Sequence, residues 1–378
     1  MLLIILGISL LGIIQRPSLA LKLFFATWPV WLLLLWYIAT SQWASYPDIS
    51  VRRSFAYITI YLIALSLAVS FEHPTDFQRP LYLGLAAIFL LNVLYYNGTS
   101  EGVSGIYAQK NGAGGIALYV VLVMTFSLAL RQSLVTKLIT LGLIVLAWIF
   151  LRSTQAKTST GIAALFTFAV PVFAYLLSQP VRYRLVAGMI LISFLATTLI
   201  ALQVLHITLN DLATAIFVDL TFTNRTLIWN ALIPEIWRHP WTGAGFGSFW
   251  ATGQLFNPIT NGTPDDFFMD AKLINEAHNG YIDITLQAGF VGLALAVFII
   301  MRSAWQFCRA ISISREDRDS RICCIIQFAL VLAIALANLT ESLVFQYSNP
   351  VGYLFLLIVV QGERWRLRDR ETVPVTNF

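Results

Sequence analysis

The residues best suited to chemistry lie at the end of one long polar interruption, about residues 205–277, in an otherwise apolar chain. Glu276, His278 and Asn279 stand together where apolar sequence resumes. An imidazole with a pKa of about 6.5 can accept a proton at neutral pH, so His278 is a candidate general base. A lone histidine at a membrane interface is usually structural, and the remaining histidines are expected to be so: His73, His206 and His239.

A set of cations forms the second chemical feature, because topology places it at or near the external ends of predicted spans. The set is Arg52, Arg53, Lys110, Lys157 and Arg225. Positive charge there opposes the orientation rule for membrane proteins, and an anionic ligand would compensate it. Guanidinium groups bind phosphate through paired donors. Snorkelling to lipid headgroups is the alternative for any one residue, but five together favour a ligand.

The polar segment offers no convincing metal site or nucleotide loop. Neither a cysteine nor a second close histidine accompanies His278, and Asp265 with Asp266 is a weak pair in a loop where acidic residues are normally solvated. The glycine-rich run at 243–247 is expected to be a flexible turn, because no strand precedes it. The sequence therefore predicts an arginine-lined site without a metal or cofactor.

Membrane-spanning helices must position these residues. Hydrophobic residues make up 58% of the 378 positions and charged residues 11%, which excludes a soluble domain with an ordinary charged surface. Ten apolar runs match the roughly 17 to 25 residues that cross a bilayer: 19–40, 52–71, 79–96, 112–130, 134–151, 159–178, 184–204, 279–301, 322–340 and 343–361. Together with a shorter run at 1–14, they predict an all-α polytopic bundle of about eleven spans.

The first apolar run is too short to cross a membrane alone. From Met1 to Ile14 it would extend about 21 Å at about 1.5 Å per residue, against a hydrocarbon core of about 30 Å. It also lacks a preceding positive residue, so it is a poor signal peptide. The chain is therefore expected to begin within a span, with one N-terminal helix missing.

Lysine and arginine counts predict the orientation of the bundle. Sixteen of the 24 fall in one set of alternating loops and eight in the other, which places the 302–321 loop and the C-terminus in the cytoplasm and the long polar segment outside. The cysteines fall on or next to the cytoplasmic side, where thiols stay reduced: Cys308, Cys323 and Cys324. Topology thus explains the basic residues, and no nucleic-acid partner is expected.

The polarity pattern divides the chain into four parts. They are a transmembrane bundle of about eight spans at 1–204, an external cap at 205–277, a group of three spans at 278–362 and a basic cytoplasmic tail at 363–378. Within the cap, 224–238 is predicted as a helix lying on the membrane, which Pro234 kinks or ends. The cap's tryptophans and phenylalanines suit interfacial anchoring, or equally a sugar-stacking platform.

Several short motifs occur in order along most of the chain. They are Trp43–Ser50 with Arg52 and Arg53, Gly105–Asn111, Ala156–Ser159, Asn224–Trp229 continuing through His239–Gly245, and Ala277–Tyr281 with Gly289 and Gly292. Together they resemble the O-antigen ligase and polysaccharide polymerase superfamily of bacterial inner membranes. The sequence departs from the family pattern at Ala156, where serine is usual, and at Asn224, where glycine is usual.

The resemblance implies a metal-independent, inverting glycosyltransferase that takes a glycan from an undecaprenyl-pyrophosphate carrier at the periplasmic face. His278 would act as general base on the acceptor hydroxyl, and Arg225 would stabilise charge developing on the pyrophosphate. The remaining site residues would hold the phosphates or the acceptor: Lys157, Arg52, Arg53, Lys110, Asn279 and Glu276. The resemblance also implies that the bilayer is the environment of the protein. Members of this superfamily usually carry about one more span than the eleven predicted from apolar runs here.

Two questions stay open at the level of sequence. The acceptor is a lipid A core, the next lipid-linked repeat or a protein hydroxyl, since ligases, polymerases and protein O-glycosyltransferases share these motifs. The alternative is a transporter or flippase of the same superfamily, for example for inorganic carbon. A transporter needs ionisable groups near the bilayer midplane, whereas Asp283 lies one turn into its span and Lys137 near an end. An enzyme is therefore favoured.

Overall fold

The computed structural model describes residues 2–99, 102–107, 109–179, 182–183, 189, 197, 225–250, 276–313, 317–346 and 349–372. Within these ranges the fold is all-α, as predicted. The elements are α1 (Leu2–Gln15), α2 (Pro17–Ala26), α3 (Trp28–Thr40), α4 (Pro47–Ser70), α5 (Pro74–Leu94), β1 (Gly98–Thr99), β2 (Gly102–Val103), α6 (Lys110–Ser127), α7 (Leu134–Thr154), α8 (Lys157–Ser178), α11 (Arg225–Arg238), α12 (Gly280–Ile313), α13 (Arg318–Ala337) and α14 (Pro350–Thr372). The two short strands pair antiparallel.

Seven helices within the described ranges are long and apolar enough to cross a membrane: α4, α5, α6, α7, α8, α12 and α13. An eighth span results if α1 and α2, which are bent by 107° where they meet, are counted together. Proline explains the bend, because Pro17 lacks an N–H and disfavours a helical conformation in the residue before it. The chain is therefore a multi-pass membrane protein.

The structure revises two of the predicted spans and leaves a third untested. The run at 19–40 is divided at Thr27 into α2 and α3, where Pro29 lies in the first turn of the second helix. The run at 343–361 becomes helical only at Pro350. The run at 184–204 lies almost wholly outside the described residues, as do Asp265, Asp266 and most of the cap. Hydropathy alone marks apolar length and does not register a proline-induced break.

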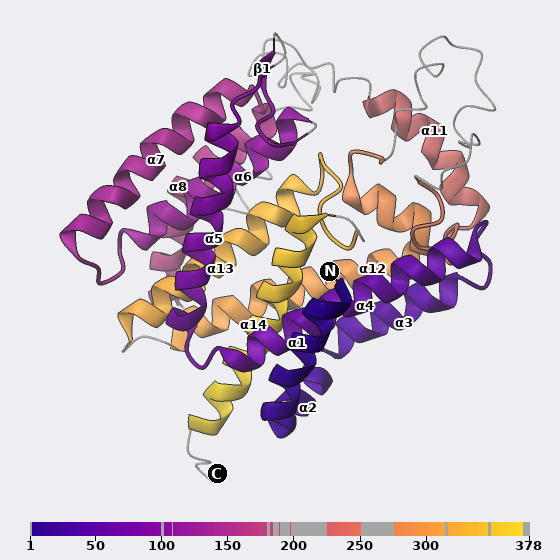
Figure 1. Cartoon of the computed structure of the whole chain (residues 1–378), viewed down its shortest axis with the longest axis horizontal. Helices are drawn as coiled ribbons and strands as arrows, with labels where there is room; N and C mark the ends of the chain where they lie inside the picture. Colours follow the sequence, from indigo (N-terminus) through magenta and orange to yellow (C-terminus); the bar gives the residue numbers. More distant parts are fainter. Residues whose placement is uncertain are drawn as a thin grey trace.

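Three C-terminal helices join two groups of helices (Figure 1). On one side α6 packs against α5, α7 and α8, and on the other α4 packs against α1, α2 and α3. Between them lie α12, α13 and α14, with α13 contacting α6 and α14 contacting α4. The stretch from Ile116 to Met124 in α6 is buried throughout, as expected for a helix that is apolar on all sides.

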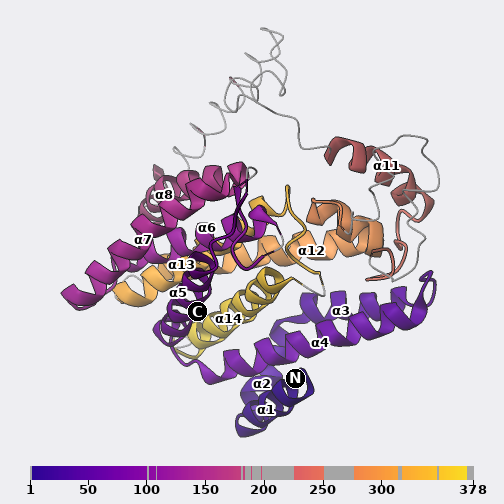
Figure 2. The same ribbon diagram turned by 45° about the horizontal axis from the view of Figure 1, so that its top comes forward.

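The predicted surface helix at 224–238 corresponds to α11, which lies outside the helical layers and contacts α12 (Figure 2). Pro234 lies inside this helix and does not end it. The last turn of α11 leads into a loop at 239–250 that returns to α12. This loop contains the glycine-rich run.

Helix α12 is broken at Gly289, whose φ of 67° is open to glycine but rarely to other residues. The glycine-rich loop satisfies the carbonyls exposed at the break: the N–H of Ala244 donates to the carbonyl of Leu286 at 2.8 Å, and that of Gly245 to the carbonyl of Gln287 at 3.0 Å. A Cβ at Gly243 would lie 2.4 Å from the backbone nitrogen of Ala288. The turn expected to be flexible is thus tied to a discontinuous helix, and its glycines permit the close approach.

Candidate active site

A cavity of about 960 Å³ lies where the two helical groups, α11 and the C-terminal helices meet. Four of the five predicted cations line it, together with two carboxylates. These residues are Arg53, Lys110, Lys157, Arg225, Glu276 and Glu341. The structure therefore gathers residues that lie far apart along the chain into one site, and the first chemical feature of that site is an excess of positive charge.

Helix N-termini supply much of this positive character. Lys110 is the first residue of α6, Lys157 the first of α8 and Arg225 the first of α11. The first turns of α6 and α8 both line the cavity. Their capping residues, Gln109 and Ala156, place no side-chain hydrogen bond on those turns. Because the N–H groups of a first turn carry partial positive charge, this part of the cavity is built to receive an anion.

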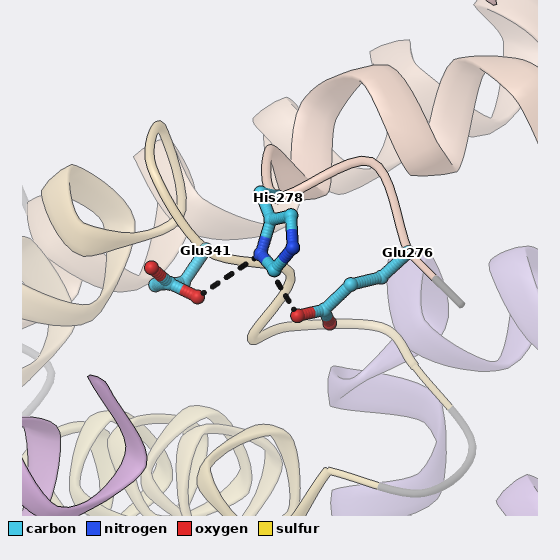
Figure 3. Close-up of side chains that lie close together, drawn as sticks. All are labelled: Glu276, His278 and Glu341. Carbon is cyan, nitrogen blue, oxygen red and sulfur yellow. Dashed lines mark ion pairs between the residues drawn. The ribbon is translucent and has the colours of Figure 1, made fainter. Parts of the chain in front are cut away.

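Glu341 joins the cationic and acid–base parts of the site. Its Oε1 accepts hydrogen bonds from Arg225 Nη2 at 2.5 Å and from Asn111 Nδ2 at 2.7 Å. Its Oε2 lies 3.6 Å from His278 Nδ1, and Glu276 Oε1 lies 3.1 Å from the same nitrogen (Figure 3). Two carboxylates thus flank one ring nitrogen of His278, and one of them also holds the arginine.

This arrangement sets the protonation of His278. Burial lowers the pKa of the imidazole, but the contacts with Glu276 and Glu341 outweigh burial and raise the pKa from 6.5 to about 9. At pH 7 His278 is therefore mostly an imidazolium. The two carboxylates beside Nδ1 stabilise the charged form of the ring, which leaves Nε2 as the nitrogen able to exchange a proton with a substrate.

Local backbone contacts bring the His278 loop and Glu341 together. The N–H of Gly280 donates to the carbonyls of Asn338 at 2.8 Å and Glu341 at 3.2 Å. A Cβ at Gly280 would lie 2.1 Å from Asn338 Oδ1, so only glycine permits this approach. Asn279 Oδ1 accepts from the N–H groups of Tyr281 and Ile282, which makes Asn279 the N-cap of α12.

The two arginines at the start of α4 occupy different positions. Arg53 lines the cavity, and its Nη1 donates to the carbonyls of Gly247 and, at 2.7 Å, Trp250. Arg52 is exposed, and its Nε donates to the Asp48 carbonyl at 3.2 Å. The predicted pair is thus separated: Arg53 fixes the turn that leads to Trp250, and Arg52 points elsewhere because adjacent residues on a helix do not share a face.

The acid–base cluster also has a spacing that would suit a cation. Donor atoms of Glu276, His278 and Glu341 all lie within 4.8 Å of one another. Arg225 and Asn111 already share Glu341 Oε1, so this oxygen is committed to two hydrogen-bond donors, one of them cationic. The prediction of a site without a metal stays a prediction. Binding of a metal ion by these three residues would contradict it.

The sequence alone did not identify Glu341 or Asn111 as site residues. Asn111 directly follows Lys110, and Glu341 is an ionisable residue at the end of an apolar run. The position of Glu341 was the available signal, because a charged residue at the end of a span requires a partner. Its partners come from α6, α11 and the His278 loop, and sequence spacing does not reveal them.

Comparisons with known proteins indicate a family for the chain. Residues 120–297 match the family described as O-Antigen ligase. The chain is also similar to the exopolysaccharide production protein ExoQ of Rhizobium meliloti (strain 1021), with 24% identity over 296 residues. That alignment covers 74% of this chain and 64% of the relative, so the chain spans less than two thirds of the relative's length. The resemblance found in the sequence motifs is confirmed.

Proposed function

From this confirmed similarity to the O-antigen ligase and polysaccharide polymerase superfamily, we propose that the chain is a metal-independent, inverting glycosyltransferase. It moves a glycan from undecaprenyl pyrophosphate to an acceptor hydroxyl at the periplasmic face of the bacterial inner membrane. The observation that carries the proposal is one cavity lined both by cationic helix N-termini and by the two carboxylates that contact His278. The predicted orientation of the loops supports the periplasmic placement.

The cavity suits both parts of a lipid-linked donor. The first turns of α6 and α8, with Lys110 and Lys157, would bind the pyrophosphate. On the α5 side the lining becomes apolar at Leu81, Leu85 and Ile88. A polyprenyl chain is a hydrocarbon, and contact with these side chains removes it from water at about 25 cal/mol per Å² of apolar surface.

In the proposed reaction the acceptor oxygen attacks the anomeric carbon on the face opposite the pyrophosphate. The bond between that carbon and the phosphate oxygen breaks, and the bonding electrons leave with the pyrophosphate. The acceptor proton passes to Nε2 of the neutral form of His278, whose Nδ1 lies next to Glu276 and Glu341. Arg225 stabilises the charge that develops on the leaving group, because its guanidinium can pair with Glu341 and retain further donors for phosphate.

We propose a saccharide hydroxyl of a growing polysaccharide as the acceptor. The support is the similarity to a protein of exopolysaccharide production. A lipid A core or a protein hydroxyl would meet the same acid–base cluster, so the acceptor class requires a direct test.

The proposal is tested by transfer in proteoliposomes with a defined undecaprenyl-pyrophosphate glycan and a saccharide acceptor, with and without EDTA. Transfer should persist in EDTA, and the new linkage should have the anomeric configuration opposite to that of the donor. A retained configuration would contradict direct displacement. Loss of transfer in EDTA that magnesium or manganese restores would assign a metal to Glu276, His278 and Glu341, or to Asp265 and Asp266.

A further inference from the structure

A fully buried carboxylate lies in the first turns of α12, next to the acid–base cluster but with no direct contact to it. Asp283 is 0% exposed. Its Oδ1 accepts a hydrogen bond from Trp250 Nε1 at 2.6 Å, and its Oδ2 accepts from the N–H of Ala277 at 3.1 Å and from the hydroxyl of Ser342. Three donors from three separate segments therefore meet on one side chain.

Each donor belongs to a segment that carries part of the site. Ala277 stands between Glu276 and His278 in the chain, and Ser342 directly follows Glu341. Trp250 lines the cavity and belongs to the loop at 239–250. Its backbone carbonyl accepts a hydrogen bond from Arg53. The three segments are thus joined at Asp283 by charge-assisted hydrogen bonds, which are shorter and stronger than neutral ones.

We propose that Asp283 is a positioning residue that fixes the spacing between His278 and Glu341, an inference that rests on the proposed function. A carboxylate suits this task because both of its oxygens accept hydrogen bonds, and here all three partners are donors. An asparagine offers one accepting oxygen and an NH₂ group that itself donates. The NH₂ group of the asparagine would therefore meet at least one of the three donors. That hydrogen bond would be lost, and the segment that carries the donor would be released.

A second buried carboxylate provides a matched control. Glu363 in α14 is 2% exposed and is contacted by Arg302, Arg366 and Gln306. Its partners belong to α12 and α14, and neither it nor they line the large cavity. Glu363→Gln thus removes a buried charge of the same kind without touching the proposed site.

The first test compares steady-state transfer by Asp283→Asn and Glu363→Gln in the same proteoliposomes. Asp283→Asn should lower kcat about a hundredfold, the loss that about 1 Å of misplacement produces. Its KM for the donor should stay within about twofold, because the phosphate-binding turns of α6 and α8 make none of these contacts. Glu363→Gln should leave both constants near the parent values. Equal losses in both variants, or a kcat within about twofold of the parent in Asp283→Asn, would overturn the proposal.

A second readout does not depend on transfer. The titration of His278, followed by NMR of labelled histidine and assigned by the signal lost in His278→Gln, should move from about pH 9 in the parent toward 6.5 in Asp283→Asn. An unchanged titration would overturn the positioning role, even if no glycan transfer were detected for any variant. Absence of transfer by the parent protein, with a shifted titration in Asp283→Asn, would instead reject the proposed function alone.

If Asp283→Asn does not insert and fold, the same measurements are made on Ser342→Ala. This change removes only the donor next to Glu341 and leaves the bonds from Trp250 and Ala277 in place. We expect a smaller loss of kcat, about tenfold, with an unchanged donor KM and a partial shift in the His278 titration. Parent-like kcat together with a parent-like titration would show that Asp283 holds the fold and does not position the site.

Discussion

Glu341 and Glu363 use similar ion-pair chemistry at two separate places in the molecule. Glu363 is contacted by Arg302, Arg366 and Gln306, and its side chain is 2% exposed. Glu341 is contacted by Arg225, Asn111 and His278, and its side chain is 17% exposed on the wall of a large cavity. The ion pair at Glu363 is closed, because both arginines are packed against a buried carboxylate. The pair at Glu341 is open, because it lines a cavity in which Arg225 can meet a ligand.

The charge balance around the two carboxylates differs in the same way. Glu363 lies between two arginines that both contact it directly, and Arg16 likewise pairs with Glu72 at 2.5 Å. The cavity wall carries four lysines or arginines against two glutamates, and both of these glutamates also contact the imidazolium of His278. A cavity lined by more cations than carboxylates favours an anionic ligand, and this difference separates a ligand site from a structural ion pair.

The largest expected effect is that of removing His278, the acid–base residue next to Glu341. His278→Ala should lower kcat about 10²-fold to 10⁴-fold, the range for loss of general-base assistance. Donor binding, measured with radiolabelled lipid pyrophosphate, should stay near the parent value, because the proposed phosphate site lies at the first turns of α6 and α8. His239→Ala, a change at an exposed histidine, is the matched control. Near-parent turnover in folded His278→Ala would move the base to Glu276 or Glu341.

The next effect tests the open ion pair itself. Arg225→Ala should weaken donor binding and lower kcat about 10²-fold to 10³-fold, the cost of losing a donor to developing charge. Arg225→Lys should restore little, because an ammonium cannot pair with Glu341 and a phosphate in the planar geometry of a guanidinium. Arg238→Lys, at the exposed far end of α11, should be neutral. Full activity of Arg225→Lys would show that charge alone is needed.

A smaller effect is expected from pH. With the pKa of His278 raised to about 9, the neutral form that can act as a base is scarce at pH 7 and increases as pH rises. We expect kcat/KM to increase about fiftyfold between pH 7 and pH 9 and then to level. Glu341→Gln removes one carboxylate from Nδ1 and should move the inflection to lower pH. A flat parent profile over this interval would indicate a carboxylate base that is already ionised.

The smallest effect on turnover is expected at the closed pair. Glu363→Gln should leave kcat of the folded protein unchanged but lower the free energy of unfolding by about 3 kcal/mol, because removing one partner leaves buried charge uncompensated. Glu341→Gln should show the reverse pattern, with lower activity and a small change in stability. Melting temperatures in detergent, measured with kcat on the same samples, test this contrast. Loss of activity in Glu363→Gln without loss of stability would contradict it.

Much of the fold was readable from the sequence because its signals are local. Apolar length predicted most spans, and the bounds of α11 differ by one residue from the predicted 224–238. Of the site residues, Arg53, Lys110, Lys157, Arg225 and Glu276 meet at the cavity. Asn279 caps α12 and Arg52 is turned toward Asp48, because these positions follow from helix geometry that residue type does not specify.

The sequence by itself determined that this chain crosses the membrane several times and that cations and a histidine stand at the ends of its spans. Hydrophobicity and charge act on each segment separately, so one sequence is enough to locate them. Only the tertiary structure decided that Glu341 pairs with Arg225 and His278 and that Asp283 ties their segments together. Those contacts depend on how α6, α11, α12 and α13 pack, and packing between distant segments leaves no fixed spacing in the chain.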